Sequence, residues 1–237
     1  MCRSMFCAIP CFWRVWDEEA RDKMLLFLPV VGLETGTIWA LLAWLCRYLA
    51  LPALVQGVVL GAYPFVVTGF IHLDGFMDVT DAVRSCRDLA RRREILKDSH
   101  VGSFAVIGIV LLALCQTALF ASARAAASLW TLVLLPAVSR CGSALAVTVL
   151  RPMSTSQYAA QKKPKSHVII LCAQLAVYLA AGFLAGWKTG LALCGCLAGY
   201  ALALRKAFRS LDGMNGDISG YSLTLSELCG AAVWALI

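Results

Sequence analysis

Long apolar runs separated by polar segments dominate the chain. The runs cover residues 24–46, 52–71, 104–121, 128–150, 167–187 and 189–204, and a shorter run of 13 residues, 225–237, comes last. A helix needs about 20 mainly apolar residues to cross a bilayer. The pattern therefore predicts an all-α fold, a polytopic integral membrane helical bundle with about six to seven transmembrane helices. The last run is either a short or tilted seventh helix or a segment cut short.

Composition supports this prediction. Hydrophobic residues make up 60% of the 237, charged residues 15%, and the mean hydropathy is +0.77. Soluble domains have about 45–50% apolar and about 25% charged residues. The net charge of +7 could indicate nucleic-acid binding. The basic residues are more simply explained as loop anchors of a membrane protein, so we expect no nucleic-acid partner.

The basic residues fall in every second polar segment. The N-terminal segment and the segments 72–103, 151–166 and 205–224 contain four, six, four and three Lys or Arg residues, 17 in all, whereas the alternate segments contain only Arg47, Arg124 and Lys188. Because cytoplasmic loops are enriched in Lys and Arg, the N-terminus and the long polar loops should be cytoplasmic. We expect one membrane-embedded catalytic domain, 1–237, with its chemistry in those loops and the adjoining helix ends.

Three aspartates stand out in the polar segment that follows the second run. Asp74, Asp78 and Asp81 are spaced i, i+4 and i+7, which places them on one face of a helix. Favourable interaction with a helix dipole accounts for one such carboxylate but poorly for three. Carboxylate oxygens suit Mg²⁺ or Mn²⁺, and Mg²⁺ is commonly held by a few carboxylates together with substrate phosphates. We interpret the triplet as a divalent metal site for chemistry on a diphosphate.

Two further polar segments contain candidate residues. "RRREILKDSHVGSF" supplies Arg93, Lys97 and Asp98 and predicts a polar turn before the next span. "LDGMNGDISGYSLTLSE" is rich in glycine, which predicts a tight turn whose backbone amides can bind phosphate. This second segment supplies Asn215, Asp217 and Glu227.

Two charges interrupt the apolar runs, namely Glu34 and Arg140. Charged residues inside spans are rare and usually face the bundle interior. Arg140 could meet a phosphate or pair with Glu34, and the sequence leaves both interpretations open.

At these residues the chain resembles the cobalamin synthases, also called adenosylcobinamide-GDP ribazoletransferases. "TGFIHLDGFMDVTDA" is similar to the central motif of that family, with Thr68 and Ala82 in place of its first and last glycines. "RRREILKDSHVGSF", "PAVSRC" and "GMNGDISGYSLTLSE" resemble three further motifs, with Leu96 replacing a Met and Asn215 a Thr. The matches occur in order over nearly the whole chain.

The resemblance implies a Mg²⁺-dependent transfer in a prokaryotic cytoplasmic (inner) membrane. Adenosylcobinamide-GDP and α-ribazole, or its 5′-phosphate, would become adenosylcobalamin, or its 5′-phosphate, with release of GMP. This is a late step in assembly of the cobalamin nucleotide loop.

We assign three roles within this reaction. The metal ligands would be Asp74, Asp78 and Asp81. The substrate-binding residues would be Arg93, Lys97, Arg140, Asn215 and Glu227. The catalytic residues would be Asp78 with Asp98, Asp217 and His72, the last three being unranked candidates for accepting the hydroxyl proton.

Two alternative functions share part of this pattern. A CDP-alcohol phosphotransferase also carries spaced aspartates in a membrane, but its order of motif residues is not found here. A transporter would place its polar site near the bilayer midplane on broken helices, whereas we expect these carboxylates at one face and in loops.

The bilayer and the two substrates are the expected partners, and a homo-oligomer is left open.

Overall fold

The computed structural model describes residues 1–10, 17–124, 127–154, 156 and 164–237. In this part of the chain ten helices form, and the only β-structure is a single bridge between Pro152 and Met214. The helices are α1 (Cys2–Phe6), α2 (Glu18–Tyr48), α3 (Ala53–Val67), α4 (Ile71–Arg84), α5 (Leu89–Ile95), α6 (Ser103–Ser122), α7 (Leu129–Val149), α8 (Lys165–Ala185), α9 (Trp187–Leu211) and α10 (Gly216–Leu236). The all-α prediction is confirmed.

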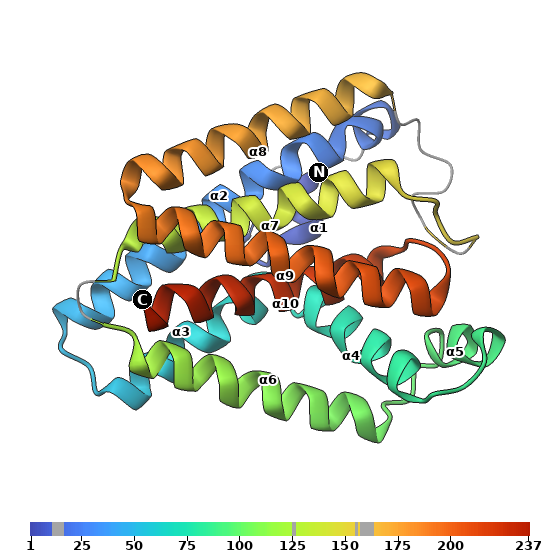
Figure 1. Ribbon diagram of the computed structural model, residues 1–237, viewed down its shortest axis with the longest axis horizontal. Coiled ribbons are helices and arrows are strands. Elements are labelled where there is room, and N and C mark those ends of the chain that lie inside the picture. The colour runs from blue at the N-terminus through green and yellow to red at the C-terminus, as the bar shows by residue number, and fades with distance from the viewer. Residues whose placement is uncertain (11–16, 125–126, 155, 157–163) are drawn as a thin grey trace.

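Each of the six long apolar runs forms a helix, namely α2, α3, α6, α7, α8 and α9. The final run is not a separate short segment: it is the second half of α10, which begins at Gly216. The segment 72–103 is more than a loop, because it contains α4 and α5. Figure 1 shows the long helices lying side by side along the longest axis of the molecule.

Burial separates central from peripheral helices. Among the described residues five helices, α2, α6, α7, α8 and α9, are long and apolar enough to cross a membrane. In its most apolar window α7 is 83% buried, whereas α6 is 22% and α8 only 11% buried. We therefore expect α6 and α8 to face lipid. Helix α10 is less apolar than these five helices. Most of its residues are buried in the protein, including the serines and threonines Ser219, Ser222, Thr224 and Ser226.

A sharp bend separates α3 from α4. Taken together, the two helices are long and apolar enough to cross a membrane, but their axes differ by 91°. Gly69 and Phe70 both have positive φ at the bend, +60° and +64°, which is strained for a phenylalanine. Pro64 within α3 has no N–H to donate to Leu60, and the indole of Trp39 donates to that carbonyl instead, at 3.0 Å. The aspartates thus lie on the second arm of a broken helix, which confirms the helix predicted for them.

The polar segments gather at one end of the bundle. Figure 1 shows α5, the residues 150–154 that follow α7 and the turn between α9 and α10 at the same end, with the connections from α2 to α3 and from α8 to α9 at the other. This agrees with the predicted grouping for the described parts of the segments 72–103, 151–166 and 205–224, whereas α1 of the N-terminal segment lies midway along the bundle. Of the residues used to predict it, Arg14, Lys162 and Lys163 lie outside the described ranges.

Candidate active site

Two glycines bring α4 and α10 into close contact. A Cβ added to Gly75 of α4 would lie 2.8 Å from backbone atoms of Asp217, and one added to Gly220 of α10 would lie 3.1 Å from the backbone of His72. Small residues at a helix crossing allow backbones to approach this closely. The two polar motifs, distant in sequence, are therefore in direct contact.

Three carboxylates gather at this crossing, and we call Asp74, Asp78 and Asp217 the carboxylate cluster. Asp78 is close enough to Asp74, Asp217 and Asp81 to be repelled by all three, and Asp217 is repelled by Asp74. Asp74 is exposed, and Asp78 and Asp217 are partly buried. In the described ranges no Lys or Arg forms an ion pair with any of the three. Within the described residues the cluster therefore carries negative charge that no Lys or Arg side chain offsets.

Asp81 has different surroundings. Its side chain is buried, and its two oxygens accept hydrogen bonds from the backbone N–H groups of Gly102 (2.7 Å) and Ala105 (2.8 Å), at the beginning of α6. These are groups that a helix leaves without partners in its first turn. Asp81 thus caps α6 and fixes α4 to it. Its predicted role as a metal ligand stays a prediction beside this observed structural role.

Asn215 orients Asp217. Its amide group donates to Oδ2 of Asp217 at 2.6 Å, while its carbonyl oxygen accepts from the N–H of Ile218 at 3.0 Å. Asn215 is thus the N-cap of α10. The expected glycine-rich turn ends here, because Gly216 and Gly220 both belong to α10. The substrate-binding role predicted for Asn215 stays untested.

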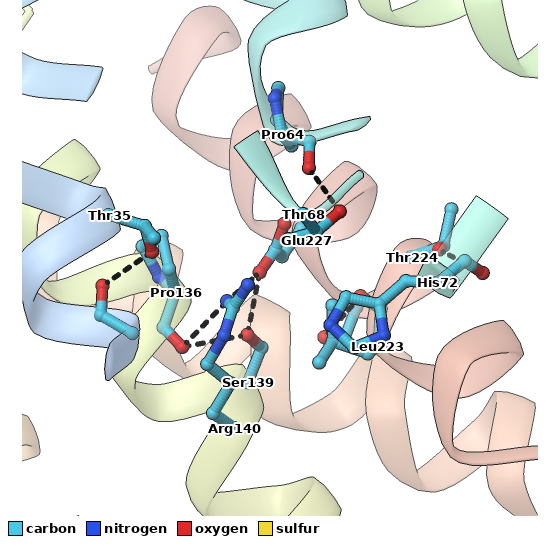
Figure 2. Close-up of polar contacts among 12 residues, drawn as sticks. Thr35, Pro64, Thr68, His72, Pro136, Ser139, Arg140, Leu223, Thr224 and Glu227 are labelled. Atoms are coloured by element: carbon cyan, nitrogen blue, oxygen red, sulfur yellow. Dashed lines mark hydrogen bonds and ion pairs between the residues drawn. The ribbon is translucent and has the colours of Figure 1, made fainter. Parts of the chain in front are cut away.

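Arg140 and Glu227 form a buried ion pair, and Figure 2 shows the contacts that meet at Glu227. Arg140 Nη1 lies 2.9 Å from Glu227 Oε1, which also accepts from the hydroxyl of Ser139 at 2.8 Å. Side chains of the pair are only 2% and 4% exposed. This joins α7 to α10. Glu34, the alternative partner of Arg140, instead pairs with Arg3 at 2.9 Å.

His72 lies at the start of α4 beneath the N-terminal helix. Its ring stacks on Phe6 of α1, with centroids 6.4 Å apart, and its Nε2 is buried with no hydrogen-bond partner among the described residues. The backbone carbonyl of His72 accepts from the hydroxyl of Thr224, and Figure 2 shows both residues beside the buried pair. His72 is available as a proton acceptor only if a substrate reaches this interior position.

The residues predicted from the segment 91–104 do not all point to the cluster. Arg93 donates to the carbonyls of Leu211 (3.0 Å) and Asp212 (2.7 Å), which end α9, so its guanidinium stabilises a helix C-terminus. Lys97 and Asp98 are exposed. Hydrogen bonds from the backbone and then the ring of His100 lower the pKa of the Asp98 carboxyl below its ordinary value. Asp98 is consequently a weaker candidate for a base than Asp217.

Several contacts in this region have no simple sequence signal. The contacts of Asp81 with Gly102, of Phe6 with His72 and of Arg3 with Glu34 join residues from different helices or connections. Ser139 could have been noticed because it precedes Arg140 within the "PAVSRC" motif. The other contacts depend on how the helices pack.

The donor set is compatible with a hard divalent cation, although the ligands are not fully assembled. Within the part of the chain that the structure covers, no three His, Cys, Asp or Glu side chains are arranged to hold a metal. Mg²⁺ often takes only one or two carboxylates and obtains further oxygens from substrate phosphates and water. The carboxylate oxygens of Asp74 and Asp78 match this requirement.

Comparison with known proteins identifies the family. The sequence profile of the family described as cobalamin-5-phosphate synthase matches residues 1–235. An adenosylcobinamide-GDP ribazoletransferase of Clostridium botulinum (strain Alaska E43 / Type E3) is 32% identical over 236 residues, which cover 97% of this chain and 93% of that protein. The protein of the same name from Clostridium perfringens (strain 13 / Type A) is 32% identical over 245 residues, covering 100% and 96%.

A more distant relative of the same name, from Corynebacterium diphtheriae, is 27% identical over 231 residues, covering 93% of this chain and 84% of that protein. No solved structure gives a significant match. The broken helix removes one argument against a transporter, but neither the transporter nor the CDP-alcohol phosphotransferase interpretation is favoured by these matches. The match of the profile to nearly the whole chain shows that it belongs to the cobalamin-5-phosphate synthase family.

Proposed function

We propose that this protein transfers α-ribazole, or α-ribazole 5′-phosphate, to adenosylcobinamide-GDP, giving adenosylcobalamin, or its 5′-phosphate, and GMP. Membership of the family and the names of the full-length relatives support the proposal. The structural observation that carries it is the carboxylate cluster at the α4–α10 crossing, for which the described part of the chain provides no basic ion-pair partner. A diphosphate could not approach four neighbouring aspartates unless a cation offset their charge.

In the proposed reaction a ribose hydroxyl oxygen forms a bond to the phosphorus on the cobinamide side of the diphosphate. The bond from that phosphorus to the bridging oxygen breaks, and the oxygen leaves with GMP. The hydroxyl proton passes to a carboxylate. Transfers of this kind depend mainly on positioning and on neutralising the charge that develops on oxygen atoms.

We assign the proton-accepting role to Asp217 and the metal-holding role to Asp74 and Asp78. Asn215 holds Oδ2 of Asp217, so the direction of the carboxylate is fixed and Oδ1 remains for the substrate. A bound Mg²⁺ would supply charge stabilisation for the diphosphate and the leaving GMP. Asp81 and the Gly75 contact hold α4 in position relative to α6 and α10. Arg140, Glu227, Arg93 and Lys97 remain proposed substrate contacts.

The membrane setting follows from the same proposal. We place the protein in the cytoplasmic membrane of a prokaryote, with its polar loops in the cytoplasm where nucleotide substrates occur. The concentration of 17 Lys and Arg residues in the polar segments assigned to the cytoplasm supports this orientation.

The test uses the purified full chain in lipid vesicles, with adenosylcobinamide-GDP, α-ribazole and Mg²⁺. We expect GMP to be released in equal amount to the cobalamin product, EDTA to stop release, and added Mg²⁺ to restore it. Release of CMP from a CDP-alcohol would favour the other enzyme class. Solute uptake without any nucleotide product would show that the protein is a transporter, and full turnover in metal-free buffer would refute the role of Mg²⁺.

A further inference from the structure

A groove on the side of α4 away from the carboxylate cluster has no role in the proposed reaction. It has a volume of about 300 Å³ and lies between α4, α6, α9 and α10. On α4 its wall includes Phe76 and Thr80. Phe76 follows Asp74 by two residues, which is a little over half a helical turn, so the groove and the cluster face different sides of the helix. The groove is therefore distinct from the site described above.

Most of the groove wall is apolar. The lining includes Leu111, Leu112 and Cys115 of α6 and Leu225 and Leu228 of α10. Phe76 stacks on Tyr221, with ring centroids 5.7 Å apart, and both rings line the groove. From Gly108 to Cys115 the wall follows α6 for about 10 Å along the helix axis. This shape and chemistry fit part of a hydrocarbon chain.

The groove opens towards the surface that we expect to contact lipid. Leu111, in its wall, is 56% exposed, and its neighbours Ile107, Val110 and Leu114 are 55%, 51% and 62% exposed. A continuous exposed apolar strip of this kind on a long apolar helix belongs in hydrocarbon. Lipid chains are therefore the molecules that meet the groove in a bilayer.

Two cations line the groove, Arg84 at the end of α4 and Lys206 in the last turns of α9. Both side chains are exposed, and the lining includes no Asp or Glu. Within the described ranges neither cation forms an ion pair with a carboxylate. Both helices end at the end of the bundle where the polar segments gather (Figure 1). The cations thus lie near the level of lipid headgroups.

We propose that this groove binds one anionic phospholipid, with its phosphate between Arg84 and Lys206 and part of an acyl chain along Leu111, Leu112 and Leu228. Paired cations above an apolar groove between membrane helices provide the charge complementarity that such a lipid needs. A zwitterionic lipid would gain less, because its own positive group would lie near the same two cations. The groove therefore selects for net negative charge.

The lipid would also influence the active site mechanically. The two main walls of the groove are α4 and α6, and Asp81 joins these two helices through Gly102 and Ala105. A lipid filling the space between them would hold the angle at which α4 presents Asp74 and Asp78. This consequence depends on the proposed function, whereas lipid binding itself does not.

The experiment measures binding without any substrate. The full chain is placed in nanodiscs containing equal amounts of phosphatidylglycerol and phosphatidylcholine, then released into detergent, and the retained lipids are counted by native mass spectrometry. We expect one phosphatidylglycerol to be retained in preference to phosphatidylcholine. Removing each cation should weaken retention roughly fivefold, and removing both roughly 25-fold.

The variants are Arg84→Gln, Lys206→Gln and the double substitution. The matched control is Arg205→Gln, which removes the same charge from the next position of α9, outside the groove lining. Gly108→Val fills the groove without changing charge, since even a Cβ at Gly108 would lie 3.1 Å from Thr80. Gly108→Val should also abolish the selective retention of phosphatidylglycerol. Thermal unfolding shows whether each variant is folded.

Two results would overturn the proposal. One is equal retention of phosphatidylglycerol and phosphatidylcholine by the wild-type protein, which needs no variant to interpret. The other is displacement of the retained lipid by adenosylcobinamide-GDP together with weaker binding of that compound to the double variant. That result would assign the groove to the substrate.

Discussion

The carboxylate of Asp81 in α4 accepts hydrogen bonds from the N–H of Gly102, at 2.7 Å, and from that of Ala105, at 2.8 Å, at the first turn of α6. One acidic residue of the motif thus stabilises the helix that follows it, whereas its neighbours Asp74 and Asp78 accept no such hydrogen bonds from the residues that the structure describes. This difference leads to opposite expectations for substitutions within a single motif.

We predict that Asp81→Asn lowers stability. An asparagine can accept one of the two hydrogen bonds, but its amide group would face the other N–H donor. The expected loss is about 1–3 kcal/mol, because a buried donor loses its partner. Gly102→Ala should have a similar effect, since its Cβ would lie 2.6 Å from Oδ1 of Asp81. Thermal unfolding in a fixed lipid mixture measures both, and unchanged stability would contradict the capping role.

Asp78→Asn should leave the fold intact and nearly abolish activity. Asp78 is repelled by Asp74, Asp217 and Asp81, so removing its charge should maintain or slightly raise stability. The loss of a metal-holding oxygen should lower GMP release by roughly 100-fold. Activity and unfolding temperature are measured on the same preparation, with Asp88→Asn, the N-cap of α5, as a control. Near-normal turnover with reduced stability would show that Asp78 is structural.

Gly75→Ala should separate α4 from α10. Its Cβ would lie 2.8 Å from the backbone of Asp217, which cannot move as easily as a side chain. We expect a stability loss of about 1–3 kcal/mol and a lower rate of GMP release. Gly61→Ala in α3 is a milder control, because the nearest atoms to its Cβ would be 3.3 Å away. Equal effects of the two substitutions on GMP release would mean that the α4–α10 contact has no particular role.

Substitutions of the buried ion pair Arg140–Glu227 can show whether the pair stabilises the fold or binds substrate. Arg140→Met alone should cost about 3–5 kcal/mol, because it leaves Glu227 charged and unpaired in the interior. The double variant Arg140→Met/Glu227→Leu should regain most of that stability. If GMP release returns with stability, the pair is structural. A stable but inactive double variant would support the substrate-binding role predicted for these residues.

Orientation can be tested at Cys86, an exposed cysteine just after α4. With the polar end in the cytoplasm, a membrane-impermeant maleimide should label Cys86 only after the cells are permeabilised. An introduced cysteine, Lys188→Cys, lies near the start of α9 at the other end of the bundle and should react in intact cells. The reverse pattern of labelling would invert the proposed topology.

What the sequence determined by itself was the succession of helices and the residues that carry charge. Apolar runs of about 20 residues have few alternatives to a helix in a bilayer, because backbone groups must form their hydrogen bonds within the segment. The spacing of Asp74 and Asp78 likewise placed them on one helical face, and α4 confirms that helix. The exact bounds of α9 and α10 were less predictable, because α10 is covered by protein and needs no continuous apolar surface.

Only the tertiary structure decided which polar residues became partners. Asp81 and Asp78 look alike in sequence, yet the start of α6 lies against one of them and not the other. The sequence offered Glu34 as a partner for Arg140, but helix packing placed Glu227 beside Arg140 and Arg3 beside Glu34. Contacts of this kind join elements far apart in the chain, and their geometry depends on close approaches such as that at Gly75. A local pattern specifies a helix and its face, whereas the neighbour of that face is set by the packing of the whole bundle.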